Sequence, residues 1–400
     1  MTVSSMMRLK RLNRGGLLVL GLILALVGGR IAYVMAVEGF NAAHFVGAFV
    51  RSFQLGSLYA LIALGYTMVY GIIRLINFAH GEVFMVGAFA SFFLFSNTPY
   101  ALPWAVLAAA VIAYGVMRVL DTFRGRLLDP VVLGGGALVF ALSVYALHTV
   151  NIHWLLAMLM SMMITAVLGI TIDRIAYRPL RGAPRMSLLI TAIAVSFFLQ
   201  NFGILAFTRN QTPYSPATSW TDPLRFEVFG STVFTSLLIV LVPLVTLVLV
   251  VALTLFVSRS RLGKAMRATA QDPETAQMMG VNVNKVIATT FLLGSMLAAA
   301  AGVLWGLSFG SLNQPAVFGI LPGIKAFAAA VIGGIGSLPG AVLGGLLLGF
   351  LENFLTALFP RTATFAGITE YRDTFAFIML VIILLIKPSG LIGEDLSEKV

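Results

Sequence analysis

The sequence predicts an all-α protein, a polytopic bundle of transmembrane helices with broken or re-entrant elements. Of the 400 residues, 59% are hydrophobic and only 10% are charged, which excludes an ordinary globular core beneath a charged surface. Apolar runs of about 20 residues, the length that crosses a hydrocarbon core about 30 Å thick, recur along nearly the whole chain. Some runs, such as 323–337, are too short to cross unaided, and these are expected to be broken or re-entrant.

The apolar runs mark roughly ten to twelve candidate spans or half-spans. They lie near residues 16–37, 54–73, 82–97, 101–119, 128–148, 154–172, 187–207, 235–257, 286–309, 323–337, 338–358 and 373–388. Nearly the whole chain is therefore expected to form one membrane domain.

The first run is expected to be a retained anchor. It follows a basic N-terminus, is longer than a signal-peptide core and lacks a clear small-residue cleavage site. Residues 1–40 are therefore assigned as a basic N-terminus plus an extra transmembrane anchor, and residues 41–400 as the main transmembrane domain.

The positive charges set the expected orientation. With the N-terminus inside, the twelve spans place 19 of the 26 Lys and Arg residues on the inner side. Basic residues collect in cytoplasmic loops, so both termini are expected to face the cytoplasm. The net charge of +11 is accordingly attributed to inner loops beside membrane lipid, and no nucleic-acid partner is expected.

One inner loop contains a short helix with strong signals at both ends. Asp272 is a favoured N-cap, and Pro273 at the first helical position loses no hydrogen bond. Glu274 in the first turn complements the helix dipole, and Gly280 can take the left-handed conformation after the helix.

The predicted helix, residues 273–279, is too short to be stable alone, because isolated helices of fewer than about 12 residues barely form in water. It must be held by other parts of the protein or by a partner. Ala276 and Met279 lie three residues apart on one face with Met278 beside them, so a small, adaptable apolar surface is expected. A plain connector with good turn chemistry is the alternative.

Polar residues between the second and third spans are a second candidate site. Asn77, His80 and Glu82 favour a cytoplasmic turn with snorkelling side chains, and an inner gate is the alternative. His80 and Glu82 are two residues apart and point to different faces of a helix, so no metal site is expected.

A glycine-rich stretch is a third candidate. Gly336, Gly340 and Gly344 recur at intervals of four, which places them on one helical face where backbones approach closely, and Pro339 is expected to interrupt that face. Pathway lining and tight helix packing remain alternatives. The stretch lacks the G-x-x-x-x-G-K-[ST] spacing of a phosphate loop, and no such motif occurs elsewhere. No cluster of catalytic acids, bases or metal ligands is found, so no catalytic residue is assigned and no enzyme is expected.

Four segments, taken in order, carry a family resemblance. They are SLYALIALGYTMVYGIIRLINFAHGEVFMVGAF (Ser57–Phe89), RIAYRPLRGAPRMSLLITAIAVSFFLQN (Arg174–Asn201), RSRLGKAMRATAQDPETAQMMGVN (Arg259–Asn282) and IKAFAAAVIGGIGSLPGAVLGG (Ile324–Gly345). Together they resemble the LivH-type permease subunit of branched-chain amino acid ABC transporters. The anchor before residue 40 and an apolar hairpin at 101–148 depart from that pattern, and neither is given a role.

The resemblance implies a permease subunit that carries leucine, isoleucine or valine across a bacterial inner membrane. The partners it implies are a second, homologous permease, two cytoplasmic ATPase subunits and a periplasmic substrate-binding protein. This chain would bind no cofactor, because the partner subunits use the ATP. A urea or short-chain amide permease shares much of the pattern and is the first alternative, and a secondary transporter is the second.

The resemblance also gives roles to particular residues. The E-A-A-x-x-x-G loop of ABC importer permeases, which forms a coupling helix in a groove of the ATPase, is similar to the pattern here. The corresponding coupling loop is Asp272, Pro273, Glu274, Ala276, Met278, Met279 and Gly280.

Two further candidates follow from the residues themselves. The outer loop Thr208–Ser231 is polar and contains prolines, so it is a candidate landing surface for the binding protein, with a plain connector as the alternative. Lys325 and Glu352 are candidates for cavity-facing charges, with snorkelling to an interface as the alternative.

Overall fold

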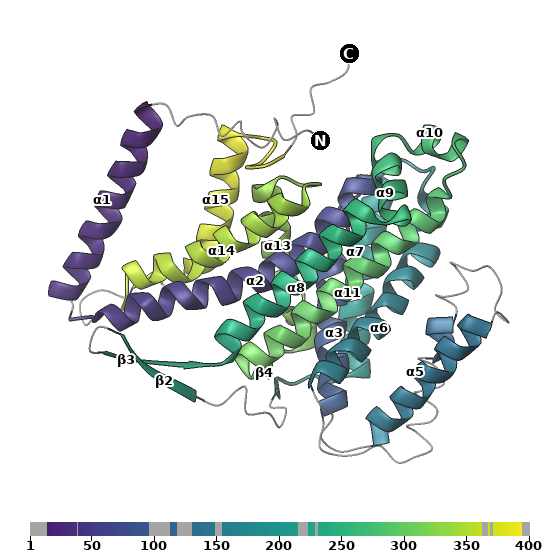
Figure 1. Cartoon of the computed structure of the whole chain (residues 1–400), viewed down its shortest axis with the longest axis horizontal. Helices are drawn as coiled ribbons and strands as arrows, with labels where there is room; N and C mark the ends of the chain where they lie inside the picture. Colours follow the sequence, from purple (N-terminus) through teal and green to yellow (C-terminus); the bar gives the residue numbers. More distant parts are fainter. Residues whose placement is uncertain are drawn as a thin grey trace.

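The protein is built almost entirely of helices (Figure 1). The computed structural model describes residues 14–37, 39–95, 113–117, 130–148, 154–214, 223–228, 231–361, 367–368 and 371–393. Within these residues, seven helical segments are long and apolar enough to cross a membrane. The predicted all-α polytopic fold is therefore confirmed, whereas parts of the candidate span 101–119 and of the hairpin 101–148 lie outside the described residues.

The helices have the following bounds. They are α1 Arg14–Ala36, α2 Ala42–Ile73, α3 His80–Phe95, α5 Pro130–His148, α6 Trp154–Ile172, α7 Arg185–Ala206, α8 Leu238–Arg259, α9 Arg261–Gln271, α10 Pro273–Met278, α11 Val283–Phe309, α12 Pro315–Phe318, α13 Ile320–Gly333, α14 Leu338–Leu358 and α15 Arg372–Ile386. A π-helical turn, Asp173–Tyr177, and a 3-10 turn, Arg178–Leu180, follow α6.

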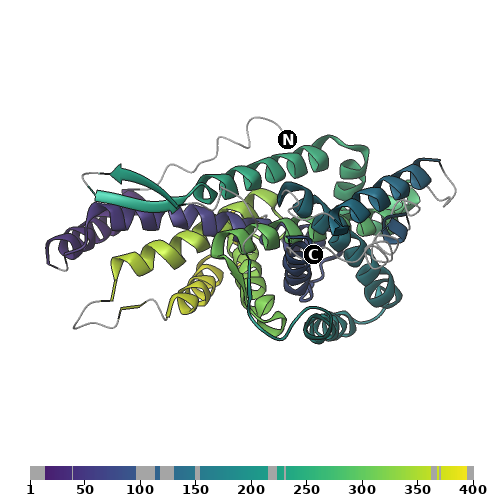
Figure 2. The same cartoon turned by 90° about the horizontal axis from the view of Figure 1, so that it is seen from below.

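Helix α2 is the centre of the fold and packs against α14, α11, α13 and α8. Every residue from Leu58 to Leu64 is at most 1% exposed. The 32 residues of α2 are about 48 Å long at 1.5 Å per residue, which exceeds a hydrocarbon core of about 30 Å. In Figure 2, α8 and the neighbouring strands lie on one side of α2, and α14 and α15 lie on the other.

The predicted start of this helix near residue 54 is wrong, because α2 begins at Ala42. The prediction began the apolar run near Gln54 because polar residues lie there, but the helix includes these residues. The Ser52 hydroxyl donates to the Ala48 carbonyl at 2.7 Å, and the Gln54 amide donates to the Ser308 hydroxyl at 3.0 Å. These polar groups are satisfied inside the protein, so the helix continues through them.

Glycines bring α2 into backbone contact with α14. A methyl group added to Gly349 would lie 2.2 Å from the backbone nitrogen of Gly56, and one added to Gly345 would lie 2.5 Å from that of Ala60. Helices in lipid gain no hydrophobic driving force by associating, so close packing of small residues supplies much of the attraction.

A break separates α13 from α14, as predicted, but its cause differs. The break occupies residues 334–337, where Gly334 and Gly336 have φ angles of 110° and 97°. The prediction that Pro339 makes the break is wrong, because Pro339 lies in the first turn of α14, where a missing N–H costs no hydrogen bond. Gly336 lies outside the helix and therefore does not share a helical face with Gly340.

The segment after α15 closes this break. The backbone N–H of Leu391 donates to the Ile332 carbonyl and that of Ile392 donates to the Gly333 carbonyl, both at 2.9 Å. These carbonyls belong to the last turn of α13, where the helix itself provides no partner. The C-terminal segment thereby satisfies backbone groups that a bilayer could not.

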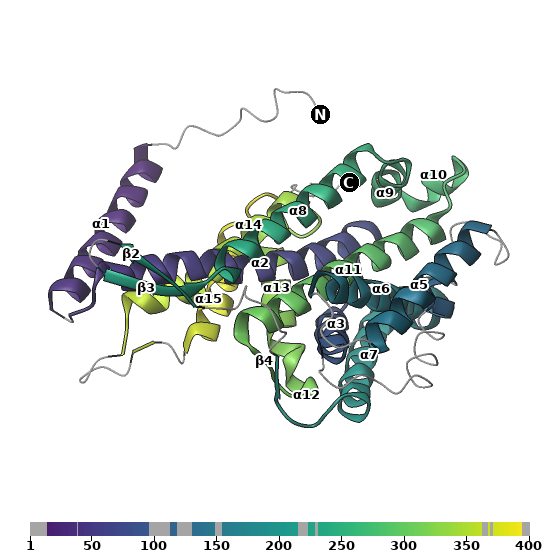
Figure 3. The ribbon, with the colours of Figure 1, turned by 60° about the horizontal axis from the view of Figure 1, so that its bottom comes forward.

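Two small antiparallel sheets occur in the described part of the chain. β1 Thr212–Pro213 pairs with β4 Ser311–Leu312, and β2 Pro223–Val228 pairs with β3 Ser231–Ser236. The prediction of a polar outer loop over residues 208–231 missed β1 and β2. Figures 1 and 3 show the strands at the opposite end of the molecule from α10.

The contact between α2 and α14 predicts that Gly349→Ala destabilises the protein. The added methyl group has no space, and overpacking costs about 1–3 kcal/mol. Gly29→Ala is the matched control, because Gly29 has no atom within 4 Å of the added group. Thermal unfolding of the purified protein in detergent measures both variants. Equal losses of stability in the two would contradict backbone contact at Gly349.

Candidate functional site

Helix α10 is capped as the sequence predicted. The Asp272 carboxylate accepts the backbone N–H groups of Glu274 at 2.9 Å and of Thr275 at 3.2 Å, and the Thr275 hydroxyl donates to it at 2.5 Å. These hydrogen bonds, that of the hydroxyl foremost, hold the pKa of Asp272 below its ordinary value. Pro273 starts the helix, and Gly280 follows it with a φ of 83°.

The exposed surface of α10 differs from the prediction. Met278 and Met279 are 86% and 81% exposed, but Ala276 is only 4% exposed. The prediction that Ala276 and Met279 share one exposed face of the helix is therefore wrong. The helix ends at Met278, and Ala276 packs inward. The surface offered to a partner is a pair of methionines, whose unbranched side chains adapt to many shapes.

Helix α9 joins α10 to the membrane helix α8. The Ser260 hydroxyl caps α9 by accepting the Gly263 N–H at 2.8 Å. A methyl group at Gly263 would lie 2.3 Å from the Val257 carbonyl oxygen, so the turn between α8 and α9 is packed backbone against backbone. Helix α10 contacts both α9 and α11. The short helix is therefore held between two longer ones.

The second candidate group is buried. Asn77, His80 and Glu82 are 3%, 1% and 1% exposed. Snorkelling of these side chains to an interface is therefore wrong, although residues 74–79 do form a non-helical turn between α2 and α3. Polar groups buried in a membrane protein are costly, so each requires a partner or a function.

Asn77 joins the segment after α2 to the π-helical turn after α6. Its side-chain oxygen accepts the Tyr177 hydroxyl at 2.6 Å and the backbone N–H of Ala79 at 3.2 Å. Tyr177 is itself fully buried. This pair fixes the non-helical residues 74–79 against the π-helical turn, and Arg74 and Leu75 line a cavity together with Asp272.

His80 lies against α2 and α11. Its ring is 4.7 Å from that of Tyr66, and a methyl group at Gly65 would lie 2.1 Å from its Nε2 atom. Nε2 has no hydrogen-bond partner among the described residues. Histidine therefore fills a space that the glycine opens.

Glu82 lies where α3, α7 and the start of α13 meet. Its Oε1 atom accepts the Gln200 amide at 2.9 Å and the Ser196 hydroxyl at 3.3 Å. Oε2 has no partner among the described residues, and a methyl group at Gly319 would lie 2.5 Å from it. Roles for Asn77, His80 and Glu82 in the transport pathway or its gate stay predictions.

The glycines of α14 contact α13. A methyl group at Gly340 would lie 2.5 Å from the Gly333 carbonyl oxygen, and one at Gly344 would lie 1.9 Å from that of Ala329. This geometry accounts for the glycines by tight packing of the α13–α14 hairpin. Pathway lining by Gly336, Pro339 and Gly340 stays a prediction.

A buried ionic cluster was missed by the sequence interpretation. Lys325 Nζ donates to Glu352 at 2.8 Å and to Asp373 at 2.5 Å, and the Tyr59 hydroxyl donates to the second oxygen of Glu352 at 2.8 Å. Lys325 and Glu352 are 5% and 3% exposed, so snorkelling to an interface is wrong for both. The cluster joins α2, α13, α14 and α15. Its four residues lie too far apart in the sequence for their spacing to predict the contact.

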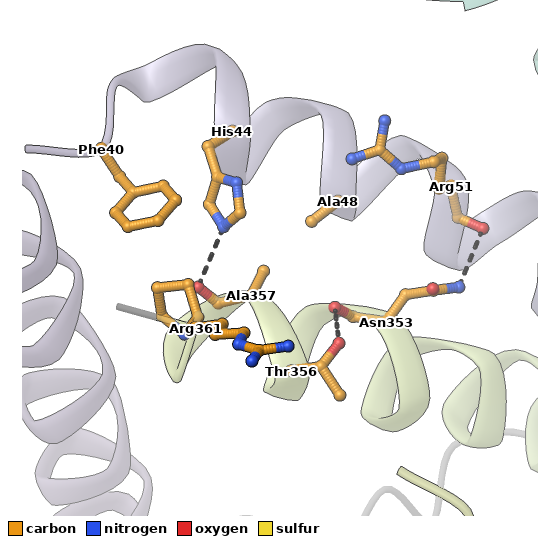
Figure 4. A pocket seen from close by; sticks show the side chains of 9 residues that line it. Phe40, His44, Ala48, Arg51, Asn353, Thr356, Ala357 and Arg361 are labelled. Carbon is orange, nitrogen blue, oxygen red and sulfur yellow. Dashed lines mark hydrogen bonds between the residues drawn. The ribbon is translucent and has the colours of Figure 1, made fainter. Parts of the chain in front are cut away.

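A cavity of about 330 Å³ lies between the start of α2 and the end of α14 (Figure 4). His44 points onto α14, with its Nε2 atom 3.2 Å from the Ala357 carbonyl oxygen, and the Asn353 amide donates to the Arg51 carbonyl at 3.4 Å. The Arg51 guanidinium lies along α2 and not toward α14. The polar groups that line this cavity do not converge on one point, so no ligand is assigned to it.

Comparisons with known proteins agree with the four sequence segments. A family described as the permease component of branched-chain amino acid transport systems matches residues 48–127 and 129–384. The high-affinity branched-chain amino acid transport system permease protein BraD of Pseudomonas aeruginosa is 39% identical over 361 residues, which cover 89% of this chain and 98% of BraD. LivH of Escherichia coli K12 is 37% identical over 360 residues, with the same coverage of 89% and 98%. A probable LivH of Methanocaldococcus jannaschii is 31% identical over 234 residues, 58% of this chain and 71% of that protein.

The ionic cluster predicts that Lys325→Met destabilises the protein by about 3–5 kcal/mol, because it removes the buried cation beside Glu352 and leaves only the half-exposed Arg372, whose Nε lies 3.5 Å from that carboxylate. The double variant Lys325→Met/Glu352→Gln is expected to recover much of this loss, because the amide is neutral and keeps an acceptor for Tyr59. Chemical unfolding of the wild type, both single variants and the double variant completes the cycle. Additive losses would contradict a coupled pair.

Proposed function

The chain belongs to the permease family of branched-chain amino acid transport systems, and we propose that it is the membrane permease subunit of an ABC importer for leucine, isoleucine and valine. The relatives BraD and LivH bear the names of high-affinity branched-chain amino acid permeases and are matched over 98% of their length. These names favour this substrate class over urea or short-chain amides.

Helix α10 is the observation that carries the proposal. It is a capped helix that exposes two methionines at the end of the molecule opposite the strands, as expected of a coupling helix seated in a groove of another subunit. The sequence has no phosphate loop of its own, so ATP is used by separate subunits and this chain binds no cofactor. The proposed partners are two ATPase subunits, a second, homologous permease and a soluble substrate-binding protein.

The motion of the ATPases reaches the membrane through α11. This helix continues for 27 residues from the end of α10 to β4 at the opposite end, and it packs against α2, α3 and α6. When the ATPase pair closes, α10 moves with it, and α11 carries that movement to the helices around it as a rigid body. Access to a central pathway then alternates between the two sides.

Charge supports an inner-membrane location with α10 in the cytoplasm. Four exposed basic residues lie at the end of α8 and along α9, which precedes α10: Arg259, Arg261, Lys264 and Arg267. The start of α1 and the end of α15 lie on the same side of the molecule as α10 in Figure 1, which supports cytoplasmic termini. The strands β2 and β3 then face the periplasm, where the substrate-binding protein lands.

The proposal predicts that Glu274→Arg and Gly280→Val leave the protein inserted but abolish ATP hydrolysis stimulated by the binding protein. Arginine opposes the helix dipole in the first turn, and a β-branched residue is strained at a φ of 83°. Lys264→Glu is the control, a charge reversal at an exposed position of α9. Normal stimulation in both test variants would refute coupling through α10.

The substrate class predicts that the reconstituted complex transports radiolabelled leucine only with ATP and its binding protein. Excess isoleucine or valine is expected to compete with leucine for transport, because all three present an aliphatic side chain on the same amino acid backbone. Urea in the same excess is expected to have no effect. Competition by urea without competition by valine would support the alternative permease class.

A further inference from the structure

A second cavity, of about 510 Å³, lies directly behind α10. Its walls come from the end of α2, the π-helical turn, the start of α7, the end of α9 and the start of α11. Cavities of about 300–1,000 Å³ are the size that holds small ligands. Asp272 and Pro273 form part of the wall, so a molecule bound there would contact the coupling loop itself.

One part of the wall is branched and aliphatic. Ile72 comes from α2, Leu188 from α7 and Ile287 from α11. Ile287 is 4% exposed, and the other two are half-buried. An aliphatic side chain placed here would leave water for an apolar surface, which favours binding.

Charges of both signs lie on the same wall. Arg74 is exposed and makes no hydrogen bond or ion pair through its side chain within the described residues. Arg181 donates to Asp173 and Asn284, both at 2.5 Å, but its buried Nε atom has no partner among the described residues. Asp272, whose carboxylate caps α10, is another lining residue of the cavity.

The backbone at Arg74 adds a further observation. Its φ of 51° makes it the one non-glycine residue with a positive φ in the described part of the chain. Residues with side chains are strained in this conformation, and such strain concentrates at binding sites and switches. The conformation ends α2 at the wall of the cavity, where Ile72, Arg74 and Leu75 are lining residues.

We propose that this cavity binds a zwitterionic aliphatic amino acid from the cytoplasm. The ligand carboxylate pairs with Arg74, the ammonium group faces Asp272, and the side chain lies against Leu188 and Ile287. The identification of this ligand as the released transport product rests on the proposed function.

Binding in this cavity opposes transport. The ligand contacts the end of α2, the start of α7, Asp272 before α10 and the start of α11, so it stabilises their arrangement in the resting state. A ligand that binds one conformation more tightly shifts the equilibrium toward it. The importer therefore slows its own ATP hydrolysis as its product accumulates in the cytoplasm.

The test uses the complete transporter in proteoliposomes with its ATPase subunits facing the bath. The binding protein and leucine are sealed inside, ATP is added outside, and ATP hydrolysis and leucine export to the bath are both measured as bath leucine is raised. Wild-type hydrolysis is expected to fall with a saturable dependence on bath leucine. Leu188→Phe, which fills the cavity, and Arg74→Gln, which removes the carboxylate partner, are each expected to raise the inhibitory concentration about tenfold or more.

Matched controls lie nearby. Ile190→Phe makes the same size of change two residues from Leu188, at a side chain that is 61% exposed and does not line the cavity. Arg259→Gln removes an exposed positive charge away from the cavity. Both controls are expected to keep the wild-type inhibition, and all four variants the wild-type rate of hydrolysis without bath leucine.

Wild-type hydrolysis that ignores bath leucine, or equal shifts at Leu188 and Ile190, would overturn the site. Leucine export in the same vesicles would then show that the proposed function stands without it, whereas absence of export with an intact complex would refute the proposed function. The alternative occupant is an ATPase side chain. Cross-linking of Leu188→Cys to an ATPase subunit in the resting complex would reveal that occupant and also overturn the site.

Discussion

The proposed transport cycle depends on how a helix of six residues is kept rigid. Such a helix is unstable alone, because nucleation fixes several residues for few hydrogen bonds. Here Asp272 satisfies the first N–H groups, Ala276 is buried, and α9 and α11 hold the two ends. A helix held in this way can transmit force, whereas a loose loop of the same sequence would absorb it.

Elsewhere in the fold, buried polar groups need hydrogen-bond or ionic partners. Within the membrane, unsatisfied donors and acceptors cost several kcal/mol, so they must find partners inside the protein. Tyr177 bonds to Asn77, Lys325 bridges Glu352 and Asp373, and the segment after α15 completes the last turn of α13. Among the described residues, His80 Nε2 and Glu82 Oε2 are two buried atoms that remain without such a partner.

Local features of this protein could be predicted from sequence, and distant contacts could not. The cap at Asp272, the helix start at Pro273 and the turn at Gly280 follow from residues a few positions apart, and all three are confirmed. Burial of Ala276 depends on the packing of α10 against α9 and α11, which no local pattern encodes. The ionic cluster brings together residues from four helices, and the start of α2 depended on partners that satisfy Ser52 and Gln54 elsewhere in the fold.

The most direct test of coupling through α10 is site-specific cross-linking in the assembled complex, since the native chain contains no cysteine. Cysteine placed at Met279, which is 81% exposed, is predicted to cross-link to an ATPase subunit, whereas cysteine at Ala276, which is 4% exposed, is predicted not to. Cross-links from Met279 to the binding protein, or none to any nucleotide-hydrolysing subunit in an active complex, would contradict the role of α10 as the joint between the permease and its motor.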